Sequence, residues 1–319
     1  MKNKIVRKKG LKTIVLNLHN IGCSQRCVFC QVHKFIDKNE ADLIAREQLS
    51  DLDSFCHKNG EPDLIILSGN DPGEYSNLAD FLKEIKKITQ AKVFIQSNCL
   101  AFSDIVFTKK VLLAGNVESI QVPLYGYKAQ IHDTITGEKG SFKKIIKALD
   151  NLKKLGFKRI KIHTLFLKQN EDFLSELFRF LLTLDLPIDA SLVCLPSCKG
   201  IYSQKTLKNV PNIEKIRSFF KREAEMIGDF NDRLFFYDLP LCLAVGAKNL
   251  SFFDSGASGG YKHFSKDKID ISKCGKGTVA SYRILKKMPT CKKCSLFNRC
   301  QGITKPYIDL NLFKPEVHA

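Results

Sequence analysis

The sequence predicts an α/β fold built on a parallel sheet, followed by a cysteine-rich C-terminal extension. Strand-like and helix-like segments alternate from about residue 12 to 200, which is the pattern of repeated βα units. A chain of 319 residues with 44% apolar and 26% charged residues can bury a core of this kind. From Pro211 onwards the alternation is lost, and a Gly, Ser and Lys-rich stretch leads into a cysteine-dense tail. We therefore expect a core domain over 1–205 and a separate C-terminal module over 206–319.

The expected strands are short apolar runs, and the helices between them repeat apolar residues at helical spacing. Six strands are expected, at Thr13–Leu18, Asp63–Leu67, Lys92–Gln96, Ser119–Val122, Arg159–Thr164 and Ile188–Val193. Helices are expected at Leu78–Ile88, Ser141–Leu155 and Asn170–Leu184, and the C-terminal module is expected to begin with a helix at Ile213–Ile227 and a strand at Leu234–Tyr237. Polar and turn-forming residues follow the first six strands, and in barrel-like α/β folds the carboxyl ends of the strands carry the chemistry.

Three cysteines follow the first strand within eight positions, at Cys23, Cys27 and Cys30. Three thiolates on a short loop can hold three irons of a 4Fe-4S cube, which leaves the fourth iron open to a small molecule. The alternative is zinc or structural thiols. Structural zinc, however, usually takes four ligands in two close pairs, and no second pair lies near this loop. The spacing therefore favours a catalytic iron-sulfur cluster.

The Cys-x3-Cys-x2-Cys triad resembles that of the radical S-adenosylmethionine (radical SAM) superfamily. The resemblance implies that the amino and carboxylate groups of SAM occupy the fourth iron and that Phe29 lies against the adenine. It also implies a partial (β/α)6 barrel of the TIM type, in agreement with six βα units, which are fewer than a closed barrel needs. One electron passed to the sulfonium of SAM would then release methionine and a 5'-deoxyadenosyl radical that removes a hydrogen atom from the substrate.

The stretch after the second strand resembles the Gly-Gly-Glu motif of this superfamily, which holds the amino group of SAM; its residues are Ser68, Gly69, Asn70 and Asp71. Asp71 would replace the glutamate, although Gly-Asn-Asp-Pro is also good chemistry for a β-turn that opens a helix. Further cofactor or substrate contacts that the resemblance implies are Gln96, Ser97 and Asn98 at the end of the third strand, Tyr125 after the fourth, Thr164 on the fifth, and Asn170.

A second group of cysteines lies near the end of the chain, at Cys291, Cys294 and Cys300, with Cys242 and Cys274 upstream. This group resembles the SPASM and twitch modules, which implies one auxiliary 4Fe-4S cluster. Four thiolates would close its coordination and make it an electron relay. Either Cys242 or Cys274 supplies the fourth ligand, and Cys242 is favoured. The alternative is a zinc site with four thiolates.

The chain carries a formal net charge of +18, with lysines scattered through the expected helices. A solvated surface explains most of this charge, although an anionic partner such as RNA stays an alternative. No apolar run is long enough to span a bilayer, and no signal-peptide pattern is present. We expect a cytoplasmic protein without membrane contact, whose 12 cysteines serve metal binding or catalysis rather than disulfides.

Three functions stay open on the sequence. The first is a radical SAM enzyme that modifies a peptide or protein, with flavodoxin or ferredoxin as the external electron donor. The second is the same chemistry on a small molecule or a tRNA nucleotide, which the basic stretch from Lys2 to Lys12 favours. The third is a non-catalytic zinc or iron-sulfur protein that binds a partner. Because the triad begins at Cys23, we expect a separate protein to recognise any leader peptide.

Overall fold

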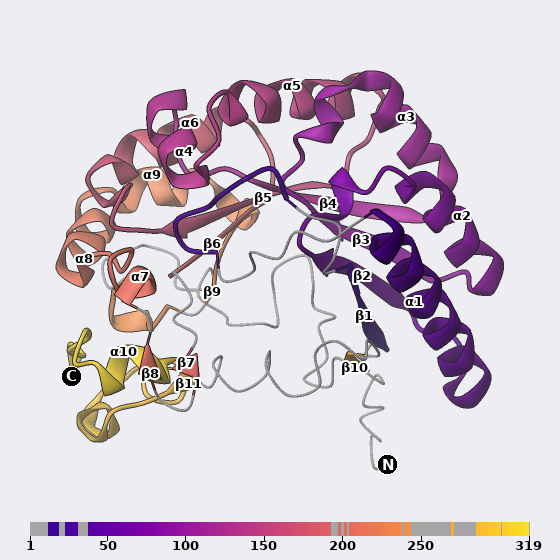
Figure 1. Cartoon of the computed structure of the whole chain (residues 1–319). Helices are drawn as coiled ribbons and strands as arrows, with labels where there is room; N and C mark the ends of the chain where they lie inside the picture. Colours follow the sequence, from indigo (N-terminus) through magenta and orange to yellow (C-terminus); the bar gives the residue numbers. More distant parts are fainter. Residues whose placement is uncertain are drawn as a thin grey trace, which may run out of the picture.

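A parallel sheet with helices on its outer side forms the body of the protein. The computed structural model describes residues 12–18, 23–30, 38–192, 197–198, 201–202, 204–237, 239–243, 269–270, 285–300 and 302–318. Eight strands form the sheet in the order β10-β1-β2-β3-β4-β5-β6-β9, and every neighbouring pair is parallel. The sheet is curved and the helices form an arc around it (Figure 1). The predicted α/β class with a partial TIM-type barrel is confirmed.

The elements follow one another as βα units over most of the chain. The sheet strands are β1 (Thr13–Leu18), β2 (Leu64–Gly69), β3 (Lys92–Gln96), β4 (Val117–Pro123), β5 (Ile160–Phe166), β6 (Ile188–Leu192), β9 (Leu234–Tyr237) and β10 (Ile269–Asp270). The helices are α1 (Lys38–Asn59), α2 (Leu78–Ile88), α3 (Ile105–Ala114), α4 (Ala129–Thr136), α5 (Ser141–Lys154), α6 (Leu174–Thr183), α7 (Gln204–Leu207), α8 (Ile213–Arg222), α9 (Ala224–Gly228) and α10 (Lys305–Asp309). Two small antiparallel pairs join β7 (Ser197–Cys198) to β8 (Ile201–Tyr202) and β11 (Leu285–Lys286) to β12 (Ile303–Thr304).

Strand β9 differs from the sequence-based expectation. It lies within the range expected for a separate C-terminal module, and it pairs in parallel with β6 of the core sheet. Aromatic packing holds β9 there: Phe236 of β9 stacks on Phe166 of β5 and Phe178 of α6, and it forms an edge-to-face pair with Phe220 of α8. Helix α8 and β9 thus add a further unit to the sheet. The domain boundary after residue 205 stays a prediction.

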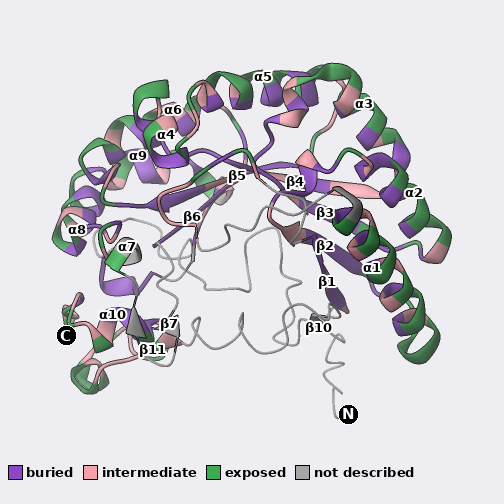
Figure 2. Ribbon diagram, in the orientation of Figure 1, coloured by how far each residue is buried: buried purple, intermediate pink, exposed green. Residues whose placement is uncertain are grey.

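Two apolar clusters lie on the two faces of the sheet. The larger one fills the space between sheet and helices, and the helices turn their buried sides toward it (Figure 2). The smaller one consists of Leu64, Ile66 and Phe94, with Val15 against it. Since neighbouring side chains of a strand point to opposite faces, these residues mark the inner face of the sheet. None of the described helices is long and apolar enough to cross a membrane.

Candidate active site

The cysteine loop, residues 23–30, lies at the carboxyl edge of the sheet, past the end of β1. Its three cysteines are free thiols and are partly exposed. The loop is held by backbone hydrogen bonds from Arg26 N–H to Thr136 C=O at 2.8 Å and from Val28 N–H to Ile135 C=O at 2.9 Å. The Asn209 side-chain amide adds a hydrogen bond to Val28 C=O at 2.8 Å. The loop is therefore braced by α4 and by the segment before α8.

The three thiols lie close enough together to affect one another. Burial and, after it, the charges of Cys30 and Cys23 together raise the pKa of Cys27 to about 12. Burial, followed by the charge of Asp71, raises the pKa of Cys23 to about 11. Like-charged thiolates in a partly buried loop need a cationic partner. An iron-sulfur cluster bound by Cys23, Cys27 and Cys30 fits this requirement.

Asp71 is fully buried in the turn after β2. Its Oδ1 accepts hydrogen bonds from the backbone N–H of Gly73 and of Asn98, both at 3.1 Å. Its Oδ2 has no hydrogen-bond partner among the residues that the structure describes. Burial raises the pKa of Asp71 to about 7. A buried carboxylate oxygen without a partner, beside Cys23, suits an ammonium group such as that of SAM.

Gly69 brings this turn close to β1. Its φ is +128°, which side-chain-bearing residues rarely adopt, and a Cβ there would lie 2.6 Å from the carbonyl carbon of Leu18. The Asn70 N–H donates to the Leu18 carbonyl at 3.3 Å, next to Ser68 and Gly69 at the end of β2. A residue with a side chain would not fit at Gly69, because the backbone of Leu18 lies too close.

Asn98, at the end of β3, connects this turn to the cysteine loop. Its Nδ2 lies 2.6 Å from Glu74 Oε1 and 3.6 Å from Cys23 Sγ, donating to both. Its Oδ1 accepts the N–H of Leu100 at 2.9 Å. Ser97 Oγ accepts the N–H of Cys99 at 2.9 Å. The predicted residues Ser97 and Asn98 thus lie beside Asp71 and Cys23.

An aromatic stack covers the other side of the cysteine loop. The edge of one ring meets the face of the other between Phe29 and Tyr125, with centroids 5.1 Å apart, and His132 stacks on Tyr125 at 5.7 Å. Asn170 holds this arrangement in place, since its Nδ2 donates to the carbonyls of Tyr125 at 2.9 Å and Leu165 at 2.8 Å. These bonds use both amide hydrogens of Asn170. The contacts that the structure gives Asn170 position Tyr125, and its predicted ligand contact stays a prediction.

Gln96 and Thr164 lie on opposite faces of the sheet. Gln96 shares the inner face with Phe94, and its Nε2 donates to Gln121 Oε1 at 3.3 Å. Thr164 is buried and its Oγ1 has no partner in the described part of the chain. It alternates with His163 and shares the outer face with Phe166, which packs on α6. On β5, the side chain that faces the inner side of the sheet is therefore that of His163, the neighbour of Thr164. The ligand contact expected of Thr164 stays a prediction.

Two residues that position the cysteine loop were not predicted as part of the site. Glu74 accepts hydrogen bonds from Ser24 and Asn98. Asn209 contacts Val28 and also accepts a hydrogen bond from Gln169 at 2.6 Å. The contacts span 50 positions for Ser24 to Glu74 and 181 for Val28 to Asn209, so neither leaves a local sequence pattern.

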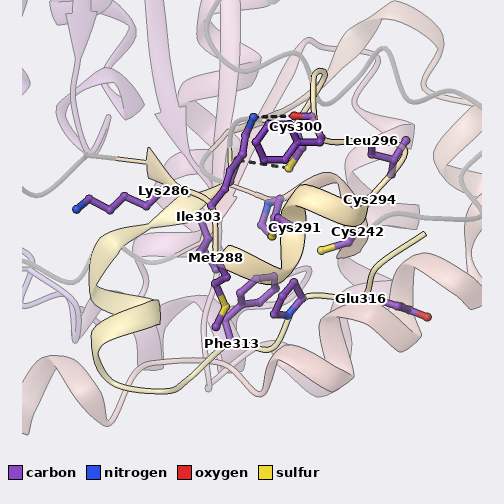
Figure 3. Close-up of a pocket in the computed structure, with 15 residues that line it drawn as sticks. Cys242, Lys286, Met288, Cys291, Cys294, Leu296, Cys300, Ile303, Phe313 and Glu316 are labelled. Carbon is purple, nitrogen blue, oxygen red and sulfur yellow. Dashed lines mark hydrogen bonds between the residues drawn. The ribbon is translucent and has the colours of Figure 1, made fainter. Parts of the chain in front are cut away.

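Four cysteines gather in a pocket formed by the C-terminal segments, namely Cys242, Cys291, Cys294 and Cys300 (Figure 3). The Cys300 sulfur accepts backbone N–H groups from Leu241 at 3.4 Å and Gly302 at 3.3 Å. Burial, together with the smaller effects of the charges of Cys300 and Cys291, raises the pKa of Cys242 to about 11. N–H donors to sulfur stabilise a metal-bound thiolate, so this pocket fits a cluster with four cysteine ligands.

Cys274, the other candidate for the fourth ligand, lies outside the described residues. Zinc would need its ligands about 2.3 Å from one point. In the ranges that the structure describes, no three His, Cys, Asp or Glu side chains are grouped to hold a single metal ion.

Comparison with known structures agrees with this fold. SuiB of Streptococcus suis bound to S-adenosylmethionine superposes with a TM-score of 0.57 at 15% identity, covering 96% of this chain and 75% of that chain. SuiB bound to precursor peptide SuiA superposes with a TM-score of 0.53 at 14% sequence identity, and the match covers 97% of this chain and 74% of that chain. Native anSMEcpe with bound AdoMet superposes with a TM-score of 0.51 at 14% sequence identity, and the match covers 68% of this chain and 62% of that chain. In a further SuiB structure the match spans about half of that chain, 49%. At these identities the likeness establishes the fold.

A search of curated protein sequences gave no match. Residues 17–181, slightly more than half of the chain, match the Radical SAM superfamily. This range begins in β1, includes the cysteine loop and the Asp71 turn, and ends in α6. The protein therefore belongs to the radical SAM superfamily.

Proposed function

We propose that the protein cleaves SAM reductively at a 4Fe-4S cluster held by Cys23, Cys27 and Cys30 and removes a hydrogen atom from a peptide or protein substrate. When bound, the cluster supplies one electron, delivered by a donor such as flavodoxin or ferredoxin, that splits SAM into methionine and a 5'-deoxyadenosyl radical. The observation that carries the proposal is the Asp71 carboxylate. It is buried, has an oxygen without a partner among the described residues, and is coupled by charge to Cys23.

Different residues of the site would bind different groups of SAM. Asp71 would accept the ammonium group of SAM, and the rigid turn at Gly69 holds the carboxylate in place. Phe29 and Tyr125 form an apolar wall against which an adenine can lie. Burial of Tyr125 raises the pKa of its hydroxyl well above the ordinary value, so the ring stays neutral beside the thiolates. This wall excludes water from the loop side of the site.

The experiment is direct. Anaerobically reconstituted protein, reduced with dithionite and given SAM, should form 5'-deoxyadenosine, whereas a Cys23→Ala, Cys27→Ala, Cys30→Ala variant should form none. Two cubes should give the brown protein roughly eight irons per chain. A colourless protein with stoichiometric zinc and no SAM cleavage would instead establish the non-catalytic metal-binding alternative.

The C-terminal pocket supports an auxiliary 4Fe-4S cluster bound by Cys242, Cys291, Cys294 and Cys300. Four protein ligands leave no open iron, so such a cluster passes electrons and does not bind SAM. An electron released when a substrate radical is oxidised could pass to it. The buried position of Cys242 and the two N–H donors to Cys300 support this assignment.

A peptide or protein substrate is supported by two solved structures of similar fold: SuiB, which was solved with precursor peptide SuiA, and anSMEcpe, which was solved with a Cp18Cys peptide. The test is incubation with candidate precursor peptides under turnover conditions. A peptide mass loss that accompanies 5'-deoxyadenosine supports the proposal, and unchanged peptides count against it.

The same chemistry on a small molecule or a tRNA nucleotide is the alternative outcome. Its sequence support, the basic stretch up to Lys12, lies almost entirely outside the described residues. RNA binding that weakens steeply with salt would favour tRNA, because each phosphate contact releases counterions. Turnover of a small molecule in the absence of any peptide would favour a small-molecule substrate.

A further inference from the structure

Glu74 lies at the centre of a hydrogen-bond network that joins the cysteine loop to the end of β3. Its Oε2 accepts the backbone N–H of Ser24 at 2.8 Å, and its Oε1 accepts the Ser24 hydroxyl at 2.6 Å. The same Oε1 accepts Asn98 Nδ2 at 2.6 Å. Asn98 Nδ2 also donates to Cys23 Sγ at 3.6 Å. One amide group therefore contacts both the carboxylate and a predicted cluster ligand.

This geometry fixes the orientation of the Asn98 amide. A side-chain amide has two N–H donors and one acceptor oxygen. The oxygen is held by the N–H of Leu100 at 2.9 Å, one donor faces Glu74, and the other faces Cys23. A flipped amide would turn its oxygen toward both the carboxylate and the sulfur, which is unfavourable. Glu74 is itself anchored at Ser24, the neighbour of Cys23. The donor to Cys23 is thus oriented by Glu74, which accepts hydrogen bonds from Ser24 and Asn98.

We propose that Glu74 is a positioning residue that aims the Asn98 amide at the Cys23 sulfur and so sets the reduction potential of the SAM-binding cluster. This inference rests on the proposed function, because it requires a cluster on Cys23. An N–H donor to a ligand sulfur stabilises the more negative, reduced cluster and raises its potential. The charge of Glu74 acts in the opposite direction. The two effects can therefore be separated by varying the reach and the charge of this side chain.

The test is a double-mutant cycle on the midpoint potential of the cluster signal that changes when SAM is added. Glu74→Asp keeps the charge but withdraws the carboxylate from Asn98. Asn98→Ser removes the amide donor, while its hydroxyl can still accept the Leu100 N–H. We expect Glu74→Asp to lower the potential in the otherwise unchanged protein and to leave it unchanged in the Asn98→Ser background. An equal shift in both backgrounds, or no shift in either, overturns the proposal.

Two further variants serve as controls. Glu74→Gln removes the charge but keeps an acceptor oxygen for Asn98, so it should raise the potential equally in both backgrounds. Glu118→Ala removes a carboxylate at the amino-terminal edge of the sheet, paired with Lys92 and Arg159, and should leave the potential unchanged. A merely structural role for Glu74 would change the unfolding free energy without this pattern of shifts. If the unaltered protein gives no SAM-sensitive cluster signal, the proposed function itself fails, and this inference fails with it.

Discussion

The Asp71 carboxylate accepts the backbone N–H of Asn98 at 3.1 Å, which joins the turn after β2 to the end of β3. This bond and the one from the Gly73 N–H both go to Oδ1, and Oδ2 has no hydrogen-bond partner among the described residues. Two loops that carry predicted SAM contacts are thereby held to one another by a hydrogen bond within the protein. Preorganisation of this kind lowers the cost of orienting a bound cofactor.

Asp71→Asn should weaken SAM binding by about 10- to 100-fold, because one charge-assisted hydrogen bond is lost. The amide oxygen can still accept from Gly73 and Asn98, so the fold should persist. Calorimetric titration of cluster-loaded protein with SAM measures the effect. Asp104→Asn is the matched control, since the Asp104 carboxylate caps α3 by accepting the N–H groups of Val106 and Phe107. Equal affinity in the Asp71→Asn variant and the unaltered protein would exclude the ammonium contact.

Gly69→Ala should destabilise the protein by at least about 2 kcal/mol, because it combines a strained φ with a collision against the backbone of Leu18. Gly228→Ala is the control: no atom lies within 4 Å of a Cβ there, and alanine favours a helix, so stability should be unchanged or slightly higher. Chemical unfolding of the metal-free protein measures both. Similar free energies of unfolding for the two variants would contradict the close-contact explanation.

Cys242→Ala should remove one cluster and reduce the iron content from roughly eight to roughly four per chain, whereas Cys274→Ala should leave it unchanged. The reason is that Cys242 lines the same pocket as Cys291, Cys294 and Cys300. Iron analysis of the reconstituted variants decides between the two ligands. Loss of iron in Cys274→Ala alone would assign the fourth ligand to that residue.

His132 should make the free energy of unfolding fall as the pH is lowered from about 6.5 to about 4, while Asp71, whose pKa burial raises to about 7, makes it rise over the same range. His132 is buried, and burial lowers its pKa to about 4, so in this range the unfolded chain binds a proton that the folded protein excludes. The loss reaches at most about 1.4 kcal/mol per pH unit from this residue. His132→Asn can still accept the Tyr125 N–H that now bonds to Nδ1 at 3.2 Å. Urea unfolding should show that the free energy of unfolding of the His132→Asn variant rises relative to that of the unaltered protein as the pH falls through this range, and the same pH dependence in both proteins would contradict the assignment to His132.

The sequence allowed prediction of features that depend on local pattern. Strands β1 and β3 have the expected bounds, because alternating and apolar runs mark them, and the cysteine spacing identified the loop. The pairing of β9 with β6 was not predicted, since it depends on aromatic contacts such as that between Phe166 and Phe236. Glu74 and Asn209 were missed for the same reason. Their partners are distant in sequence, and a lone Glu or Asn carries no signal of such a contact.

The central claim is that one iron of the cluster bound to Cys23, Cys27 and Cys30 is left open for SAM. The most direct measurement is electron–nuclear double resonance of the reduced protein with SAM labelled isotopically at its amino nitrogen. The structure predicts a hyperfine coupling between that nitrogen and the cluster, because Asp71 lies beside Cys23 where the amino group would bind. A reduced, iron-loaded protein whose cluster shows no coupling to the labelled nitrogen would contradict the claim.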